Sequence, residues 1–210
     1  MRVFACMATS LDGKIGPAGV DHFVPIGSRY DMKNLISLRD EADGILFGAS
    51  TFRTWPKVHH GNDPNRSAHH FIMSRSLDLD FQADLFQHPE IPITIFSGSE
   101  NTVPSQTIPE HVDIVSAPDH PSQIDFILRY VTKCGVKSLM VEGGGHIIHS
   151  FIAAQALDEL YLTLVPVVIG DKRAPALLGG QSLAAPPHIK ILESRQIGNE
   201  TFLHLEFSYS

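Results

Sequence analysis

The sequence has few cysteines, no long hydrophobic run and no excess of positive charge. Its two cysteines, Cys6 and Cys134, form neither a CxxC motif nor the even, closely spaced set of a disulfide framework. We therefore expect two buried free thiols in a reducing compartment. No segment approaches the roughly 20 apolar residues of a membrane span, and the first residues lack the apolar core of a signal peptide. These absences favour a cytoplasmic protein without a membrane partner.

The charge balance is acidic, with a net charge of −7 at pH 7 and a pI near 5.9. An acidic surface repels phosphate backbones, which argues against nucleic acid as a partner but leaves room for one local basic pocket. The 12 histidines form no HxH or HExxH motif, so we expect no metal site. The 210 residues and the 43% hydrophobic content predict one domain over residues 1–210.

Short segments typical of strands alternate with segments typical of helices. The expected strands cover 3–8, 44–47, 70–73, 93–97, 112–115, 138–141, 159–165, 189–196 and 201–207. The expected helices cover 28–41, with Ser28 as its cap, 123–134, with Ser122 as its cap and Gly135 as its stop, and 146–156. The turn-rich segment 58–65 predicts an exposed loop. This order predicts an α/β fold with a mostly parallel sheet, helices on both faces and an antiparallel hairpin at the C-terminal end.

Three glycines follow the expected strand 138–141. Gly143, Gly144 and Gly145 separate Glu142 from an apolar helix that begins at His146. Glycines let the backbone turn tightly and let a ligand reach the N–H groups at a helix start, so the motif predicts a phosphate or pyrophosphate site. A glycine turn without a ligand is the plain alternative. Because the motif is not GxGxxG and no acidic residue follows about twenty positions later, a standard Rossmann dehydrogenase is disfavoured.

Two other strand ends carry groups that suit a nucleotide. Gly48 and Thr51 follow the strand 44–47, and Ser74 and Arg75 follow the strand 70–73. An arginine in that position is placed for a nucleotide 2′-phosphate, although a plain surface charge explains Arg75 equally well. Since ligands of open α/β sheets bind at the carboxyl ends of the strands, the three motifs together predict a nucleotide site along one edge.

Four charged residues near the N-terminus are candidates for the substrate side. Asp12 and Lys14 lie in the loop after the first strand, where they could bind a polar ring or an anion, or serve the geometry of a turn. Asp31 and Arg39 lie near the two ends of the first helix, where each favours the helix dipole. Either of them could instead face the cleft.

Several of these motifs resemble one family. SLDGKI at 10–15, LR at 38–39, EADGILFGAST at 41–51 and MVEGGG at 140–145 resemble, in this order, the reductase domain of riboflavin biosynthesis, which has a dihydrofolate-reductase-like fold. The segments 48–55 and 71–77 are also similar to dihydrofolate reductase itself. The resemblance implies a homodimer and NADPH as cofactor, with contacts at Gly48, Thr51, Ser74, Arg75, Gly143, Gly144, Gly145 and His146. It implies catalytic or substrate contacts at Asp12, Lys14, Arg39 and Glu142.

The resemblance also implies a reaction, in which the ribosylamino group of a diaminopyrimidinone ribose phosphate is reduced to a ribitylamino group. NADPH supplies the hydride, and an acid or water supplies a proton. The departures from the family's pattern fall on the substrate side: Cys6 and Met7 where a lysine is common, no aspartate–proline after Thr51, and no serine–x–tryptophan at 22–25. Two alternatives therefore stay open. One is a reductase of a pterin or another heterocycle, with Asp31 as the ring-binding acid, and the other is a nucleotide-binding protein without catalysis.

Overall fold

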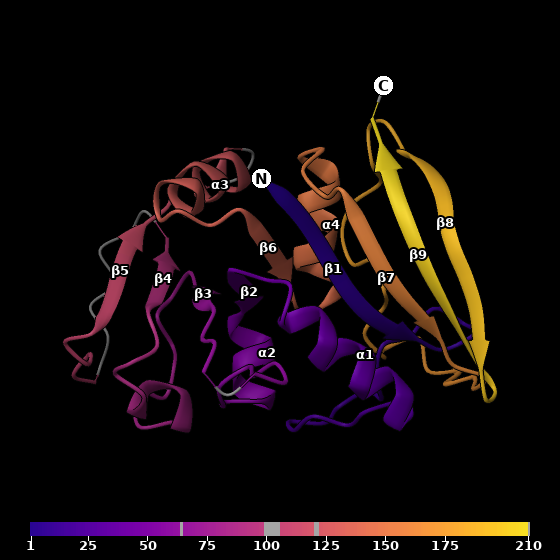
Figure 1. Cartoon of the computed structure of the whole chain (residues 1–210), viewed down its shortest axis with the longest axis horizontal. Helices are drawn as coiled ribbons and strands as arrows, with labels where there is room; N and C mark the ends of the chain where they lie inside the picture. Colours follow the sequence, from indigo (N-terminus) through magenta and orange to yellow (C-terminus); the bar gives the residue numbers. More distant parts are fainter. Residues whose placement is uncertain (64, 99–105, 120–121, 210) are drawn as a thin grey trace.

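A nine-stranded sheet crosses the molecule in the order β5-β4-β3-β2-β6-β1-β7-β9-β8 (Figure 1). The computed structural model describes residues 1–63, 65–98, 106–119 and 122–209. The strands are β1 (Arg2–Thr9), β2 (Gly44–Gly48), β3 (His69–Met73), β4 (Ile93–Ser97), β5 (Val112–Ser116), β6 (Ser138–Val141), β7 (Glu159–Leu164), β8 (His188–Ile197) and β9 (Glu200–Ser208). Each expected strand is present, with bounds that differ by at most two residues.

All neighbouring strands from β5 to β7 pair in parallel, whereas β9 pairs antiparallel with both β7 and β8. The predicted mostly parallel sheet with an antiparallel C-terminal hairpin is confirmed. Gly198 adopts a φ of 62° in the turn between β8 and β9, a conformation that glycine reaches without a steric cost.

Helices cover both faces of the sheet. They are α1 (Arg29–Arg39), α2 (Ala49–Thr54), α3 (Gln123–Lys133) and α4 (Gly145–Ala153), with a short 3₁₀ helix η1 (Asp84–Gln87). Successive side chains of β1 point to opposite faces, so Phe4 packs in one buried cluster with Leu38 of α1 and Phe52 of α2. Val3 packs in a second cluster, which includes residues of α3 and α4. The sheet is therefore the middle of three layers (Figure 1).

The helix ends correct several details of the sequence prediction. Ser28 caps α1 as expected, since its hydroxyl accepts a hydrogen bond from the Tyr30 N–H at 3.1 Å, but the helix ends at Arg39. Ser122 is the N-cap of α3, yet its hydroxyl donates to the Asp119 carbonyl instead of capping the helix. Helix α4 ends at Ala153, before the predicted 156, because Gln155 turns to a φ of 55°.

Two expectations about burial were right only in part. Cys6 is buried as expected, but Cys134 is exposed. The segment 58–65 was expected to be an exposed loop, and His60, Asn62, Asp63 and Asn65 are exposed, but Val58 and His59 are buried against the sheet. No helix in the described ranges is long and apolar enough to cross a membrane.

Candidate active site

Strand β6 is shorter than its neighbours β1 and β2, so a gap remains between these two strands beyond the end of β6. Val141, the last residue of β6, pairs with Ala5 of β1 and Leu46 of β2. Strand β1 then continues through residues 6–9 and β2 through 47–48 without β6 between them. The chain after β6 turns at Gly143, with a φ of 153°, and enters α4. The gap between β1 and β2 therefore lies at the carboxyl edge of the sheet, where ligands of α/β proteins bind.

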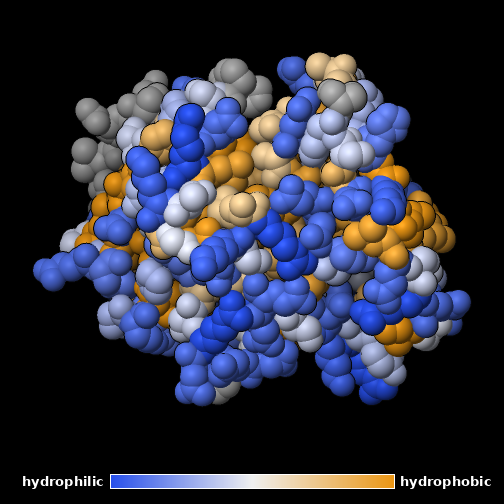
Figure 2. Space-filling view, turned by 45° about the horizontal axis from the view of Figure 1, so that its top comes forward, coloured by the Kyte–Doolittle hydropathy of each residue, from blue (hydrophilic) through white to orange (hydrophobic). Residues whose placement is uncertain are grey.

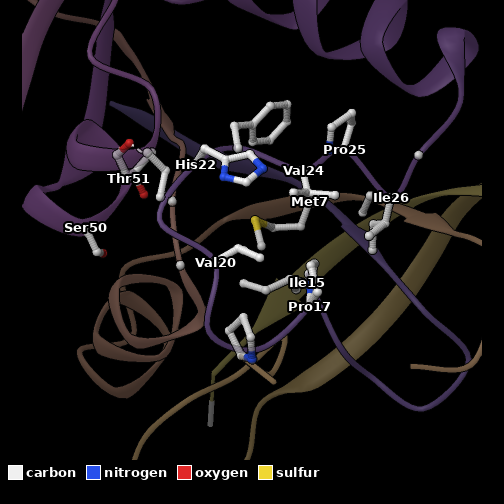
Figure 3. Close-up of a pocket in the computed structure, with 18 of the residues that line it drawn as sticks. Met7, Ile15, Pro17, Val20, His22, Val24, Pro25, Ile26, Ser50 and Thr51 are labelled. Carbon is white, nitrogen blue, oxygen red and sulfur yellow. Dashed lines mark hydrogen bonds between the residues drawn. The ribbon is translucent and has the colours of Figure 1, made fainter. Parts of the chain in front are cut away.

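A cavity of about 400 Å³ fills this gap and extends beneath the segment 15–27. Cys6, Met7 and Ala8 of β1 form part of its wall, and Gly143 and Gly144 form another part. Figure 3 shows side chains from separate elements directed toward a common space: Ser50 and Thr51 on one side, Pro25 and Ile26 on the other, and Met7, Ile15, Val20 and Val24 between them. A mostly apolar cavity with a few polar groups is typical of small-molecule sites.

Glu142 lines this cavity and forms a buried ion pair with Arg39. The Arg39 Nε and Nη2 atoms each donate to a different carboxylate oxygen at 2.7 Å, and the side chains are 11% and 7% exposed. His59 Nδ1 lies 2.8 Å from the same carboxylate and donates to it. Burial alone raises the pKa of Glu142, but the electrostatic effect of His59 and Arg39 and the hydrogen bonds that both donate outweigh it and hold that pKa well below its usual range. Glu142 is therefore an ionised acceptor.

His59 and His70 support Glu142 from beneath. The His59 ring stacks on Phe47 with centroids 4.3 Å apart, and its backbone N–H donates to His70 Nε2 at 3.1 Å. Since Nε2 accepts, the His70 proton sits on Nδ1, which donates to the Ala68 carbonyl at 2.9 Å. Burial lowers the pKa of His70 to about 3, so this ring stays neutral. The pair was missed in the sequence, where His59 and His70 showed only as members of two adjacent-histidine pairs.

Asp31 lines the same cavity from the first turn of α1. Burial raises the pKa of its carboxyl, and the negative charge of Glu200 adds to this effect. Glu200 accepts from the Ser28 N–H at 2.6 Å and from the Ser28 hydroxyl at 2.5 Å, which fixes the start of α1. A Cβ at Gly27 would overlap the Asp31 side chain, so a larger residue there would displace the Asp31 carboxyl. Asp31 thus holds a proton more readily than an ordinary aspartate does.

Asp12 and Lys14 are not among the described residues that line the cavity. The Asp12 carboxylate accepts from the N–H groups of Ile169 and Gly170 at 3.0 and 2.8 Å. Lys14 Nζ donates to the Ala174 carbonyl at 3.2 Å. The structure therefore places both residues where they fasten the 169–174 segment to the end of β1.

The chain segments that follow β2 and β6 lie side by side, as their positions after parallel strands predict. A Cβ on Gly143 would lie 3.2 Å from Thr51 Oγ1 and 3.7 Å from the Gly48 nitrogen. A Cβ on Gly144 would meet no atom within 4 Å, and both Gly143 and Gly144 line the cavity. Gly145 serves packing instead, because a Cβ there would overlap the chain at 176–177.

Five of the eight expected cofactor residues lie outside the cavity lining, namely Gly48, Ser74, Arg75, Gly145 and His146. The His146 ring packs against Gly179. Ser74 and Arg75 follow β3, the neighbour of β2, and the Ser74 hydroxyl is buried without a hydrogen-bond partner among the described residues. Arg75 is exposed and its backbone packs against Gly98. No group of three or more metal-binding side chains occurs in the described part of the chain.

The comparison with known proteins fits this geometry. The chain belongs to the RibD C-terminal domain family, whose profile matches residues 2–203. Two similar relatives are named 2,5-diamino-6-ribosylamino-4(3H)-pyrimidinone 5′-phosphate reductase. The one from Aquifex aeolicus is 27% identical over 82% of this chain and 80% of its own length. The one from Archaeoglobus fulgidus is 24% identical over 91% of this chain and 92% of its own length.

Solved structures share the fold. A pyrimidine reductase-like protein from Corynebacterium diphtheriae superposes with a TM-score of 0.78 at 22% identity, covering 100% of this chain and 92% of that one. The riboflavin biosynthesis reductase Rib7 of Saccharomyces cerevisiae superposes with a TM-score of 0.75 at 18% identity, covering 99% of this chain and 90% of that one. The predicted dihydrofolate-reductase-like fold and the family resemblance are confirmed.

Proposed function

We propose that residues 1–210 act as one NADPH-dependent reductase domain of riboflavin biosynthesis. Its substrate is a diaminopyrimidinone ribosylamino 5′-phosphate, the compound in the names of the relatives, and it works in the cytoplasm. The observation that carries the proposal is the opening above β6. There the bare amides of Gly143 and Gly144 adjoin a cavity that also contains two carboxyl groups, Asp31 and Glu142.

The cofactor half of the site combines free backbone groups with small side chains. Gly143 and Gly144 leave room for a pyrophosphate before α4, where the helix start favours negative charge. The exposed Arg75, which follows β3, supplies donors for a 2′-phosphate, and this supports NADPH over NADH. When bound, the reduced nicotinamide supplies the hydride.

The two carboxyl groups have different roles, Glu142 as a hydrogen-bond acceptor and Asp31 as a proton donor. Glu142, held ionised by Arg39 and His59, accepts hydrogen bonds from the amino or hydroxyl groups of the substrate. Asp31, whose pKa is raised by burial, holds the proton that a reduced nitrogen or oxygen needs. Two carboxyls with pKa values pushed apart in one cavity are a common arrangement for an acid and a fixed acceptor.

Gly144→Ala tests the cofactor site. The added methyl meets no protein atom within 4 Å, and Gly144 needs no positive φ, so the variant should keep its melting temperature. We expect it to bind NADPH at least about tenfold more weakly in a fluorescence titration, because the methyl occupies the approach of the pyrophosphate. Arg75→Ala should weaken NADPH but not NADH, whereas the exposed Arg129→Ala should change neither. An unchanged NADPH affinity in Gly144→Ala contradicts the proposed cofactor position.

The placement of Asp31 also favours a second candidate, reduction of a pterin-like heterocycle, because a buried carboxyl with a raised pKa can hold a proton for a ring nitrogen. The two candidates differ in substrate. Turnover of the diaminopyrimidinone phosphate with NADPH supports the first, and turnover of a dihydropterin that is lost in Asp31→Asn supports the second. Binding of NADPH with turnover of neither supports a protein without catalysis.

A homodimer through β8 completes the proposal. This edge strand leaves Ile189 54% and Ile191 61% exposed, and Figure 2 shows hydrophobic surface on the side of the molecule that carries the hairpin. An exposed apolar edge strand is usually covered by a partner. Ile191→Lys should shift sedimentation from dimer to monomer, while Leu178→Lys, an equally apolar exposed site elsewhere, should not.

A further inference from the structure

The candidate active site has few positive charges for a phosphorylated substrate. Among the described residues that line the cavity, Arg173 is the one arginine or lysine, and the acidic groups Asp31 and Glu142 face the same space. The other basic group in the lining, His22, lies beside Asp21, with its Nδ1 3.1 Å from that carboxylate. A phosphate dianion in this cavity therefore has one obvious cationic partner.

The two cations expected from the sequence are already engaged. Arg39 gives two hydrogen bonds to Glu142 and a third to the His60 carbonyl at 3.2 Å, and it is not part of the cavity lining. Lys14 donates to Ala174 and also lies outside the lining. Moving Arg39 to a phosphate would leave Glu142 buried with less compensation, which is strongly unfavourable.

We infer that Arg173 is the residue that recognises the 5′-phosphate of the substrate. Its Nε and Nη2 atoms bond Asp171 at 3.1 and 2.8 Å, and the Arg173 N–H adds a third bond to the same carboxylate at 2.9 Å. These contacts orient the guanidinium, and its Nη1 edge makes no hydrogen bond to the described residues. Because the pair with Asp171 is exposed, it contributes little by itself, and a phosphate can join or replace it.

The loop that carries Arg173 is fixed to the end of β1, so the Arg173 side chain is held in a defined place beside the cavity. Asp12 holds the amides of Ile169 and Gly170, and the Ile15 N–H donates to the Pro175 carbonyl at 2.9 Å. Substrate-binding groups act best when the backbone beneath them is held rigidly. The motif at 10–15 thus acts on the substrate through the 169–175 loop.

This inference rests on the proposed function, and a comparison of two substrates tests it. Steady-state kinetics with NADPH would use the diaminopyrimidinone ribosylamino phosphate and its dephosphorylated form. Arg173→Ala should lower kcat/KM for the phosphorylated compound by about tenfold or more and leave the dephosphorylated one within about twofold. Lys172→Ala is the matched control, because Lys172 is an exposed neighbour outside the cavity lining, and it should behave as the wild type.

Other results would overturn the inference in recognisable ways. Equal losses with both substrates mean that Arg173 acts on the fold and not on the phosphate. A loss confined to NADPH affinity means that the arginine serves the cofactor. If the wild type reduces neither compound, the proposed function fails, and calorimetry with ribose 5-phosphate then decides the role of Arg173. Binding that Arg173→Ala weakens about tenfold and Lys172→Ala does not supports the phosphate site, and binding that is equal in all three proteins, or absent from the wild type, refutes it.

Discussion

The ion pair between Arg39 and Glu142 offers the sharpest test of the site, through its effect on stability. Replacing either partner by methionine keeps an unbranched side chain but leaves a buried charge without its partner. The two side chains are only 11% and 7% exposed. Removing one partner of a buried pair costs about 3–5 kcal/mol, so each single variant should lose about that much free energy of unfolding. This loss is a large share of the roughly 5–15 kcal/mol of a typical domain.

The double variant should lose much less than the sum of the two single variants. With both charges removed, the main remaining cost is the His59 Nδ1–H group, which loses its acceptor and is worth about 1–3 kcal/mol. Urea unfolding followed by circular dichroism measures the four free energies. We expect a coupling of about 3 kcal/mol or more between Arg39 and Glu142.

A pair on the protein surface provides the control for this cycle. Lys190 and Glu206 lie 3.7 Å apart but are 73% and 49% exposed, so the same methionine substitutions there should couple by less than about 1 kcal/mol. Additive losses at Arg39 and Glu142, within about 0.5 kcal/mol, would refute the view that each charge is buried and depends on the other.

Three further predictions concern other buried or anchoring contacts. The pKa of His70 is about 3 in the folded protein and near 6.5 in the unfolded chain, so acid protonates the unfolded chain first. The contribution of His70 to the free energy of unfolding is therefore complete above pH 6.5 and is lost as the pH falls toward 3, with about 2 kcal/mol lost at pH 5. Between pH 7.5 and 5, the free energy of unfolding of His70→Gln should fall less than that of the wild type. The control His188→Gln, at an exposed position, should show the same fall as the wild type. Glu200→Gln should cost about 1.5–3 kcal/mol, since its buried carboxylate accepts two short bonds from Ser28, and the cost should shrink in a Ser28→Ala background. Asp12→Ala should speed hydrogen exchange of the amides at 169 and 170 at least about tenfold without unfolding the protein, and unchanged exchange would contradict its anchoring role.

The sequence was sufficient to predict the sheet and the proximity of three residues of the candidate site. Gly48 and Gly143 lie 95 positions apart, yet each was expected within two residues of the end of a strand, and parallel strands bring their carboxyl ends to one edge. That rule needs only the strand positions and their direction. It explains why Gly48, Thr51 and Gly143 could be grouped before their contacts were known.

The buried histidines could not be found in the same way. His59 lies in a segment of turn residues without the periodicity of a helix or strand, and such a segment reads as an exposed loop. Its burial depends on the flat face of Phe47 and on a carboxylate 83 residues further along the chain. Arg173 was missed for a related reason, because only the folded chain shows that the expected cations Arg39 and Lys14 are engaged elsewhere.

The position of Asp12 changes what its motif can do. Bonds from the Ser10 hydroxyl and from the Ile169 and Gly170 amides hold the pKa of Asp12 well below its usual range, so its carboxylate stays ionised and is a poor proton donor. Glu142 is ionised for a different reason, because Arg39 and His59 donate hydrogen bonds to its buried carboxylate. Of the carboxyl groups expected at the site, this leaves Asp31, which lines the cavity and whose pKa is raised. Asp31 on α1 is therefore a better candidate for the proton donor than Asp12, although Asp12 belongs to the more conspicuous motif at 10–15.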